Sequence, residues 1–306
     1  MEYALQAAGP YHRLLDAAAF ATERGLVALA LPDHYLMALS DEEARTTPAP
    51  DAFIQLGGLA RDTTDIDLVM LVSPITFRHP AVIAKMAVTL DRMSNGRFTL
   101  GIGTGWMDRE HEVFGFDYPD MKERFARLEE ALAYVTAAFD PETPGFTGEY
   151  YQLESFPLSP APLGKLPILV GGTGAHKTPK LAGRYADEFN VYPGPDLAAR
   201  IDRFRVAAID AGRDPDTILL SSSGQVVAAA TEADFEDLMN ANAEKAGITR
   251  EELEGHYEKR QTPRGTYEQV NETLDRFTDL GIQRFYFQGI FTPTDTGRLL
   301  DGLGVT

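Results

Sequence analysis

Residues 78–106 read RHPAVIAKMAVTLDRMSNGRFTLGIGTGW, and this stretch decides the fold. Apolar residues recur three or four positions apart over 80–92, which predicts an amphipathic helix; they are Val82, Ile83, Met86, Ala87 and Leu90. Pro80 suits a helix start because its missing N–H needs no partner there. Gly96 ends the helix, and 97–102 predicts a strand. A helix feeding a strand in this way is the unit of a parallel α/β sheet.

The glycines that close this strand indicate a functional site. Gly101, Gly103 and Gly105 occupy alternate positions, and Thr104 and Trp106 complete the opening. Such a pattern serves a backbone that another group approaches closely, or one that needs a positive φ. Ligands collect at the carboxyl ends of parallel strands. The sequence therefore predicts a ligand site at this strand end.

Short apolar runs alternate with amphipathic stretches along the chain, which is typical of repeated βα units. We predict strands near residues 2–7, 26–31, 66–72, 97–102, 167–171, 188–192, 217–228 and 284–289. We predict helices near residues 12–24, 51–61, 80–92, 120–138, 176–186, 196–211, 266–279 and 293–302. Eight such units predict a closed (β/α)8 TIM barrel, with residues 1–306 as one domain.

Two insertions and a hairpin interrupt the alternation. Residues 34–50 form a polar, proline-bearing loop after the second strand, and 230–264 carry an acidic helical pattern. Residues 146–153 predict a small hairpin within a proline-rich connection. Loops at the carboxyl side of a barrel usually build the substrate site, so we expect substrate selection to lie there.

Composition limits the possible functions. The 306 residues include no cysteine, which excludes disulfides, thiolate nucleophiles and cysteine metal sites, so redox chemistry needs an organic cofactor or a non-thiol metal. A net charge of −18 disfavours nucleic acid and anionic membranes as partners. No apolar run is long enough to span a bilayer. The N-terminus lacks the pattern of a signal peptide, so we expect a cytoplasmic protein that acts on a small molecule.

The second predicted strand ends in a candidate proton-transfer residue. Asp33 and His34 follow the strand within PDHY at 32–35. Histidine is the commonest general acid or base, because it titrates near neutral pH. A histidine beside an aspartate is also often just a hydrogen-bonded loop residue. The position at a strand end favours the catalytic interpretation.

The third predicted strand ends in a polar segment, SPITFRHP at 73–80. Arg78 can hold an anion or pair with a carboxylate. His79 directly precedes Pro80 at a helix start, which favours a structural role. Further on, His111 and Glu112 suggest metal ligands, but no HExxH helix or second ligand cluster accompanies them. We therefore predict no metal site.

A glycine-rich turn follows the fifth predicted strand. Residues 171–178 read GGTGAHKT and lead into a helix, whose first N–H groups and dipole suit a phosphate. Lys177 and Thr178 can add charge and a hydroxyl donor. Many βα turns use glycine only to turn, so the motif alone is weak evidence. Trp106, the single tryptophan, can wall a planar ring or fill the core.

Together these motifs resemble the bacterial luciferase-like monooxygenase superfamily, in particular its branch that uses the deazaflavin coenzyme F420. The matching segments, in order, are PDHY at 32–35, SPITFRHPAVIAKMAVTLDRMSNGRFTLGIGTGW at 73–106, EHEVFGFDYP at 110–119 and PILVGGTGAHKTPKLAGRYADEFN at 167–190. The resemblance implies a barrel with a flavin-like ring across its carboxyl end. The segment 78–106 is specific to the superfamily, whereas the choice between F420 and FMN is less so.

The resemblance also implies roles for individual residues. His34 corresponds to a histidine beside the reactive ring carbon in several deazaflavin enzymes. The cofactor site it implies comprises Met70, Leu71 and Ser73 on the third strand, Thr104, Gly105 and Trp106 beside the ring, and Gly171, Gly172, Thr173, Gly174 and Thr178 at the phosphate. A non-proline cis peptide is expected around Met70-Leu71. Trp106 stands where sugar-phosphate dehydrogenases of this branch place a glutamate, which argues against sugar-phosphate oxidation.

The predicted reaction is hydride transfer between F420 and a small organic substrate. His34 would carry the matching proton, and Asp33 would orient its imidazole. An FMN-dependent monooxygenase of the same fold is the alternative, and a non-catalytic flavin-binding protein is a second one. Members of the superfamily commonly dimerise through helices near the second and third strands, so we expect a homodimer.

Overall fold

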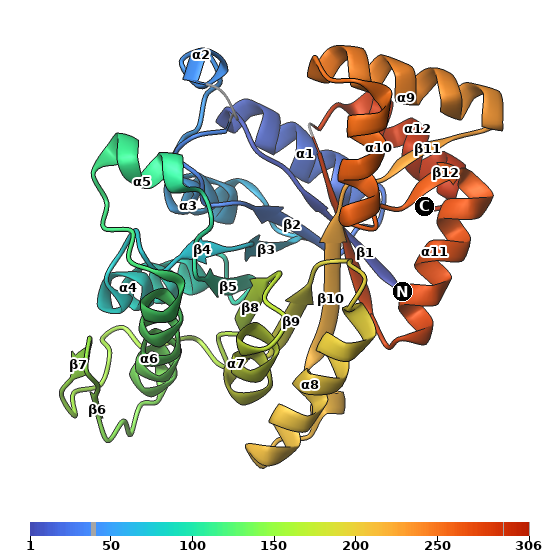
Figure 1. Ribbon diagram of the computed structural model, residues 1–306. Coiled ribbons are helices and arrows are strands. Elements are labelled where there is room, and N and C mark those ends of the chain that lie inside the picture. The colour runs from blue at the N-terminus through green and yellow to red at the C-terminus, as the bar shows by residue number, and fades with distance from the viewer. Residues whose placement is uncertain (38–40, 290, 306) are drawn as a thin grey trace.

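The computed structural model describes residues 1–37, 41–289 and 291–305 of the chain, and these form a closed parallel barrel wrapped by helices (Figure 1). Pairing between β3 and β5 closes the ring, in which β13 lies between β1 and β10. The barrel strands are β1 (Glu2–Gln6), β2 (Ala28–Leu31), β3 (Asp67–Met70), β5 (Phe98–Gly103), β8 (Ile168–Gly172), β9 (Glu188–Val191), β10 (Leu219–Gly224) and β13 (Arg284–Gln288). The predicted TIM barrel is confirmed.

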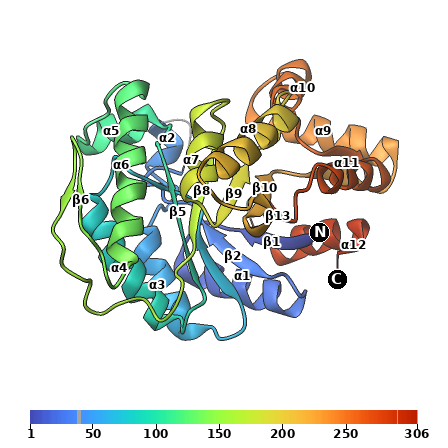
Figure 2. The ribbon, with the colours of Figure 1, turned by 90° about the horizontal axis from the view of Figure 1, so that it is seen from below.

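Helices cover the outside of this barrel, as the two orthogonal views show (Figure 2). The covering helices are α1 (Tyr11–Glu23), α3 (Ala52–Asp62), α4 (Pro80–Met93), α6 (Met121–Phe139), α7 (Lys177–Tyr185), α8 (Leu197–Asp210), α11 (Tyr267–Asp279) and α12 (Pro293–Leu303). Each lies where a helix was predicted, because the apolar spacing that marks a helix is also what packs it on a sheet. The main hydrophobic core fills the layer between helices and strands.

Two predicted strands differ most from the structure. The prediction of one strand over 217–228 was wrong: β10 ends at Gly224, and β11 (Val227–Ala229) leaves the barrel to pair with β12 (Arg264–Thr266). The predicted strand 66–72 ends at Met70, before a cis peptide bond between Leu71 and Val72, and continues only as β4 (Ser73–Pro74). The prediction of that bond at Met70-Leu71 was one residue early.

The glycines of β5 make room for this irregular segment. A Cβ at Gly101 would lie 2.0 Å from the carbonyl oxygen of Met70, and one at Gly103 would lie 2.9 Å from Cγ2 of Val72. Across the barrel mouth, a Cβ at Gly171 would lie 3.0 Å from Cγ1 of Val72. Both glycines of β5 thus serve the close backbone approach that the sequence predicted.

The insertions add elements around this frame. The acidic insertion forms α9 (Glu232–Ala246) and α10 (Arg250–Lys259), which pack together beside α11 (Figure 1). The predicted hairpin is the antiparallel pair β6 (Phe146–Thr147) and β7 (Gln152–Leu153). The loop 34–50 contains α2 (Asp41–Ala44), and its residues 38–40 lie outside the described part. Two further short elements are α5 (Asp108–Phe114) and the 3-10 helix η1 (Pro215–Thr217).

Helix α4 shows where the apolar pattern holds and where it fails. Ile83, Ala87 and Leu90 are buried as predicted, whereas the side chain of Val82 is 49% exposed. At the start of the helix, the backbone N–H of Ala81 donates to Nδ1 of His79 at 3.1 Å. This cap confirms the structural role predicted for His79.

The inside of the barrel holds an apolar cluster, which includes Val69, Leu71 and Leu169, and a group of polar residues. Alanines of β1 and β2 line one part. On the other part, Tyr286 donates its hydroxyl to Glu188 at 2.9 Å, and Asn190 donates to Ser221 at 2.9 Å. Burial raises the pKa of Glu188, against the opposing effect of Arg284. These buried polar groups thus find hydrogen-bond partners within the barrel.

Candidate active site

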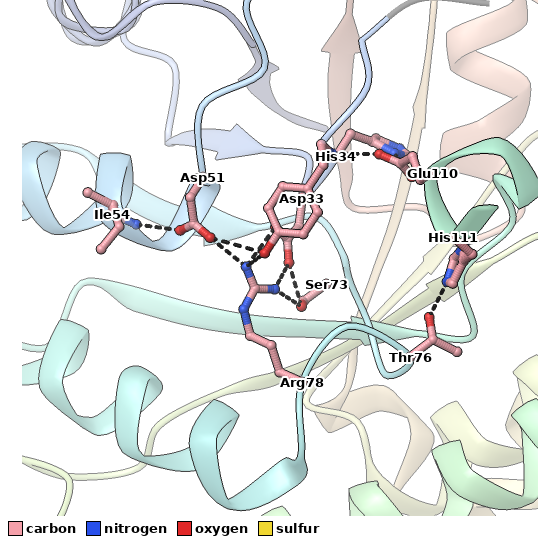
Figure 3. A network of polar contacts seen from close by, with 10 residues as sticks. Asp33, His34, Asp51, Ile54, Ser73, Thr76, Arg78, Glu110 and His111 are labelled. Atoms are coloured by element: carbon pink, nitrogen blue, oxygen red, sulfur yellow. Dashed lines mark hydrogen bonds and ion pairs between the residues drawn. The ribbon is translucent and has the colours of Figure 1, made fainter. Parts of the chain in front are cut away.

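His34 stands at the carboxyl end of β2, held by a carboxylate from a different part of the chain (Figure 3). Its Nδ1 lies 2.9 Å from Oε2 of Glu110, which sits in the short helix α5. The side chain of His34 is 18% exposed, and that of Glu110 is 1% exposed. The imidazole therefore reaches the edge of the site while its partner is completely buried.

Glu110 binds the loop as well as the ring. Its Oε1 accepts hydrogen bonds from the backbone N–H groups of Tyr35 at 2.6 Å and Leu36 at 2.9 Å. Both carboxylate oxygens are thus occupied by residues of one loop. A buried carboxylate needs such partners, because leaving it unpaired would be strongly destabilising.

Asp33 belongs to a separate, neighbouring network. Its carboxylate accepts from the Ser73 hydroxyl at 2.7 Å and from the Arg78 guanidinium, which also reaches Asp51 at 2.7 Å (Figure 3). Burial raises the pKa of the Asp33 carboxyl, while the contacts with Arg78 and Ser73 oppose that rise. Arg78 therefore pairs with carboxylates, which is the second of its two predicted roles.

The prediction that Asp33 orients His34 was wrong, because Glu110 does so instead. The structure also places Ser73, a predicted cofactor residue, completely buried against Asp33. Glu110 was not predicted, because its neighbours His111 and Glu112 are the residues of this segment that suggest metal ligands. The available signal was the position of Glu110 in the first turn of a helix that follows the Gly103–Trp106 opening.

The loop after β5 forms one wall of the site. Trp106 is 61% exposed, which rules out the core interpretation, and its ring meets that of His34 edge-on at 5.6 Å between centroids. Gly105 has a φ of +77°, a conformation that favours glycine. The Arg124 guanidinium, which sequence reasoning missed, donates to the carbonyl of Gly105 at 2.8 Å. The loop is therefore held in place, with Trp106 displayed at the rim.

The turn after β8 has the features of an anion site. Gly172 has a φ of +151°, and a Cβ at Gly174 would lie 2.5 Å from the hydroxyl of Thr178. No side chain caps the N-terminus of α7, which Lys177 begins, and Thr173 is exposed beside it. An uncapped helix start behind a glycine turn offers N–H donors and a favourable dipole to a phosphate.

The mouth of the barrel lies between these two loops. Gln6 at the end of β1 donates to the carbonyl of Leu71 at 2.6 Å, and Gln288 at the end of β13 donates to the Tyr192 hydroxyl at 2.9 Å. Leu71 belongs to the cluster inside the barrel, but Met70 packs in the outer core. Met70 therefore stays a predicted cofactor residue whose side chain packs away from the inside of the barrel.

His111 has two polar contacts that need no metal. Its Nε2 lies 2.7 Å from the Thr76 hydroxyl, and its Nδ1 lies 2.8 Å from the carbonyl oxygen of Met107. Among residues 1–37, 41–289 and 291–305, no three side chains of His, Asp or Glu are grouped to hold a metal ion. In the same part of the chain, no helix has the length and apolar character needed to cross a bilayer.

Comparison with known proteins identifies the family. The chain matches the luciferase-like monooxygenase family model over residues 2–290, and it belongs to that family. It is similar to an F420-dependent glucose-6-phosphate dehydrogenase of Microbacterium testaceum, with 34% identity over 69% of this chain and 62% of the relative. It is also similar to a pyrimidine monooxygenase of Allorhizobium ampelinum, with 33% identity over 56% of this chain and 48% of the relative.

The aligned regions span less than two thirds of the length of these relatives. Among solved structures, an F420-dependent secondary alcohol dehydrogenase in complex with an F420-acetone adduct superposes with a TM-score of 0.79. The match covers 100% of this chain and 98% of that chain at 19% identity. At this identity the likeness concerns the fold.

Proposed function

We propose that this protein is an F420-dependent oxidoreductase that moves a hydride between the deazaflavin and an alcohol or carbonyl group of a small organic substrate. The observation that carries the proposal is the placement of His34 at the barrel mouth, beside Trp106 and fixed by Glu110. The similarity to an F420-dependent glucose-6-phosphate dehydrogenase supports the same cofactor.

The residues around the mouth fit such a cofactor. The Gly172–Gly174 turn and the start of α7 would hold its phosphate, with Thr173, Lys177 and Thr178 beside them. Leu71, Gly171, Thr104 and Gly105 would border the ring. When bound, F420 supplies a ring carbon that exchanges hydride and does not readily activate oxygen. The protein then has to supply placement, exclusion of water and a proton.

His34 would supply the proton step. In the oxidising direction, the substrate hydroxyl would give its proton to Nε2 of His34, and bound F420 would accept the hydride, with its two electrons, from the adjoining carbon. The reverse reaction returns the proton from the imidazolium. General acid or base catalysis of this kind contributes about 10²- to 10⁴-fold to a rate. Asp33 has a structural role in this proposal, since it binds Ser73 and Arg78, and it takes no part in the proton transfer.

Cofactor binding tests the proposal directly. We expect F420 to bind with a change in its fluorescence. His34→Ala should then retain nearly the same F420 affinity and lose turnover by at least about 100-fold. Unchanged turnover in this variant would remove His34 from the reaction.

An FMN-dependent monooxygenase is the second candidate, favoured by the similarity to the pyrimidine monooxygenase. Tight binding of FMN, with oxygen consumption in the presence of reduced flavin, would support it over F420. A flavin-binding protein without activity would retain cofactor but show no reduction by any alcohol donor.

We also propose a homodimer formed through α3 and α4. These helices pack together, and Ile54 and Val82 on them are 74% and 49% exposed. Two exposed apolar side chains on neighbouring helices suit a contact surface. The molar mass in solution should be twice that of the chain, and Val82→Asp should lower it. A monomeric wild-type protein would contradict the proposal.

A further inference from the structure

The Glu110 carboxylate binds both the imidazole of His34 and the backbone of the same loop, and these contacts bear on which ring nitrogen of His34 is protonated. Oε1 accepts from two backbone N–H groups, those of Tyr35 and Leu36, and Oε2 faces Nδ1 of His34. The distances are 2.6, 2.9 and 2.9 Å, so all three contacts have hydrogen-bond length. An ionised carboxylate can only accept hydrogen bonds. With Glu110 as a carboxylate, the hydrogen in this contact would be the one on Nδ1 of His34.

We propose that Glu110 is a positioning residue that holds neutral His34 in the Nδ1–H tautomer, and so leaves Nε2 as the proton acceptor. In a neutral histidine, the hydrogen bond made by one ring nitrogen determines which of the two nitrogens is protonated. A histidine in water prefers the opposite tautomer, with the hydrogen on Nε2. The role in catalysis rests on the proposed function, whereas the tautomer does not.

The tautomer matters because Nε2 of His34 must have a free lone pair to accept the proton of the substrate hydroxyl. During alcohol oxidation, the hydroxyl O–H bond would break and its proton would form a bond with Nε2, while bound F420 would supply the carbon that accepts the hydride. Only the Nδ1–H tautomer has a lone pair on Nε2. The imidazolium that results donates from Nδ1 to the Glu110 carboxylate, which stabilises the new positive charge.

A single amide substitution can reverse the tautomer while keeping the loop in place. In Glu110→Gln, the two N–H groups of Tyr35 and Leu36 still require an acceptor, so the amide oxygen stays with them. The amide NH₂ then faces Nδ1 of His34 and donates to it. Nδ1 becomes an acceptor, and the hydrogen of the neutral ring moves to Nε2. A role limited to anchoring the loop would produce no such reversal.

Nitrogen NMR on the full-length protein tests this without cofactor or substrate. Long-range ¹H–¹⁵N spectra at about pH 9, above the usual titration range of histidine, distinguish the two tautomers. The chain has six histidines, so the His34 signals are assigned as those absent from His34→Gln. We expect Nδ1–H in the wild type and Nε2–H in Glu110→Gln. The matched control is Glu112→Gln, because Glu112 lies in the same helix but is exposed and paired with Arg109.

Kinetics give a second readout once F420 turnover is established. Glu110→Gln should lower kcat by about 10²- to 10⁴-fold with little change in KM or in F420 binding. An Nε2–H tautomer in the wild type would overturn the proposal, and the wild-type spectrum alone decides this even if the variant does not fold. An Nδ1–H tautomer in a protein that fails to bind F420 would instead leave the positioning role of Glu110 intact and reject the proposed function.

Discussion

Replacing Gly103 by alanine tests whether the glycines of β5 exist to admit Val72. The new Cβ would lie 2.9 Å from Cγ2 of Val72, and its next neighbour, the carbonyl oxygen of Gly171, would lie 3.4 Å away. Ordinary contact between these carbon atoms requires about 3.5–4.0 Å. Val72 must therefore move by roughly 0.6–1 Å, and overpacking of this kind destabilises a protein by about 1–3 kcal/mol.

A second substitution, at Val72, should restore part of the stability that Gly103→Ala loses. Val72→Ala removes Cγ2, so Gly103→Ala/Val72→Ala should be more stable than the sum of the single changes by about 1 kcal/mol or more. Gly101→Ala should not be rescued in this way, because its Cβ would lie 2.0 Å from the backbone carbonyl oxygen of Met70. Gly255→Ala in α10 is the control, since no described atom beyond its own helix backbone and chain neighbours lies within 4 Å of its Cβ position.

Thermal unfolding at a fixed scan rate provides the assay. For a chain of this size, each kcal/mol lowers the midpoint by about 2 °C. We expect the unfolding midpoint of Gly103→Ala to lie about 2–6 °C below that of the wild type, consistent with destabilisation by about 1–3 kcal/mol from overpacking. A Gly103→Ala midpoint equal to that of the wild type, or additive effects in the double variant, would refute the packing argument.

Three further outcomes follow from the buried charges and the single tryptophan. Arg78→Met removes the cation from buried Asp33, so it should destabilise the protein by about 3–5 kcal/mol in denaturant titration, and adding Asp33→Asn should recover part of this loss. Burial raises the pKa of the Glu188 carboxyl, so the folded chain binds the carboxyl proton more tightly than the unfolded chain does. The contribution of Glu188 to the free energy of unfolding should therefore fall as the pH rises above the ordinary pKa of 4.5. Glu188→Gln should flatten this fall, and an unchanged slope of the free energy of unfolding against pH would contradict the argument. Trp106→Phe should keep F420 binding but remove the tryptophan emission that reports it, and loss of F420 binding in this variant would contradict this expectation.

The sequence was sufficient for the barrel because periodicity encodes burial. The apolar run Leu68–Met70 and the spacing of Ile83, Ala87 and Leu90 each follow from what a buried strand or a helix face requires. Val82 departs from the pattern because spacing identifies an apolar side chain and not the surface that covers it. The end of β10 was missed although Gly224 interrupts the predicted strand there, because a glycine within a strand pattern does not say to which sheet the next residues belong.

The site was harder to predict because its partners come from distant segments. His34 and Glu110 are separated by 76 positions in the chain, and so their contact has no local signature. Asp33 was adjacent in sequence and seemed the natural partner, but successive side chains at a strand end point to different sides. Asp33 turns instead to Ser73 and Arg78, while His34 turns to Glu110 and Trp106.

The most direct test of the account is a titration of the wild-type protein with F420 that follows cofactor fluorescence and Trp106 emission together. Both signals should change and saturate at the same F420 concentration, because the ring would lie beside Trp106 at the barrel mouth. Absence of binding, or binding that leaves Trp106 emission unchanged, would contradict it.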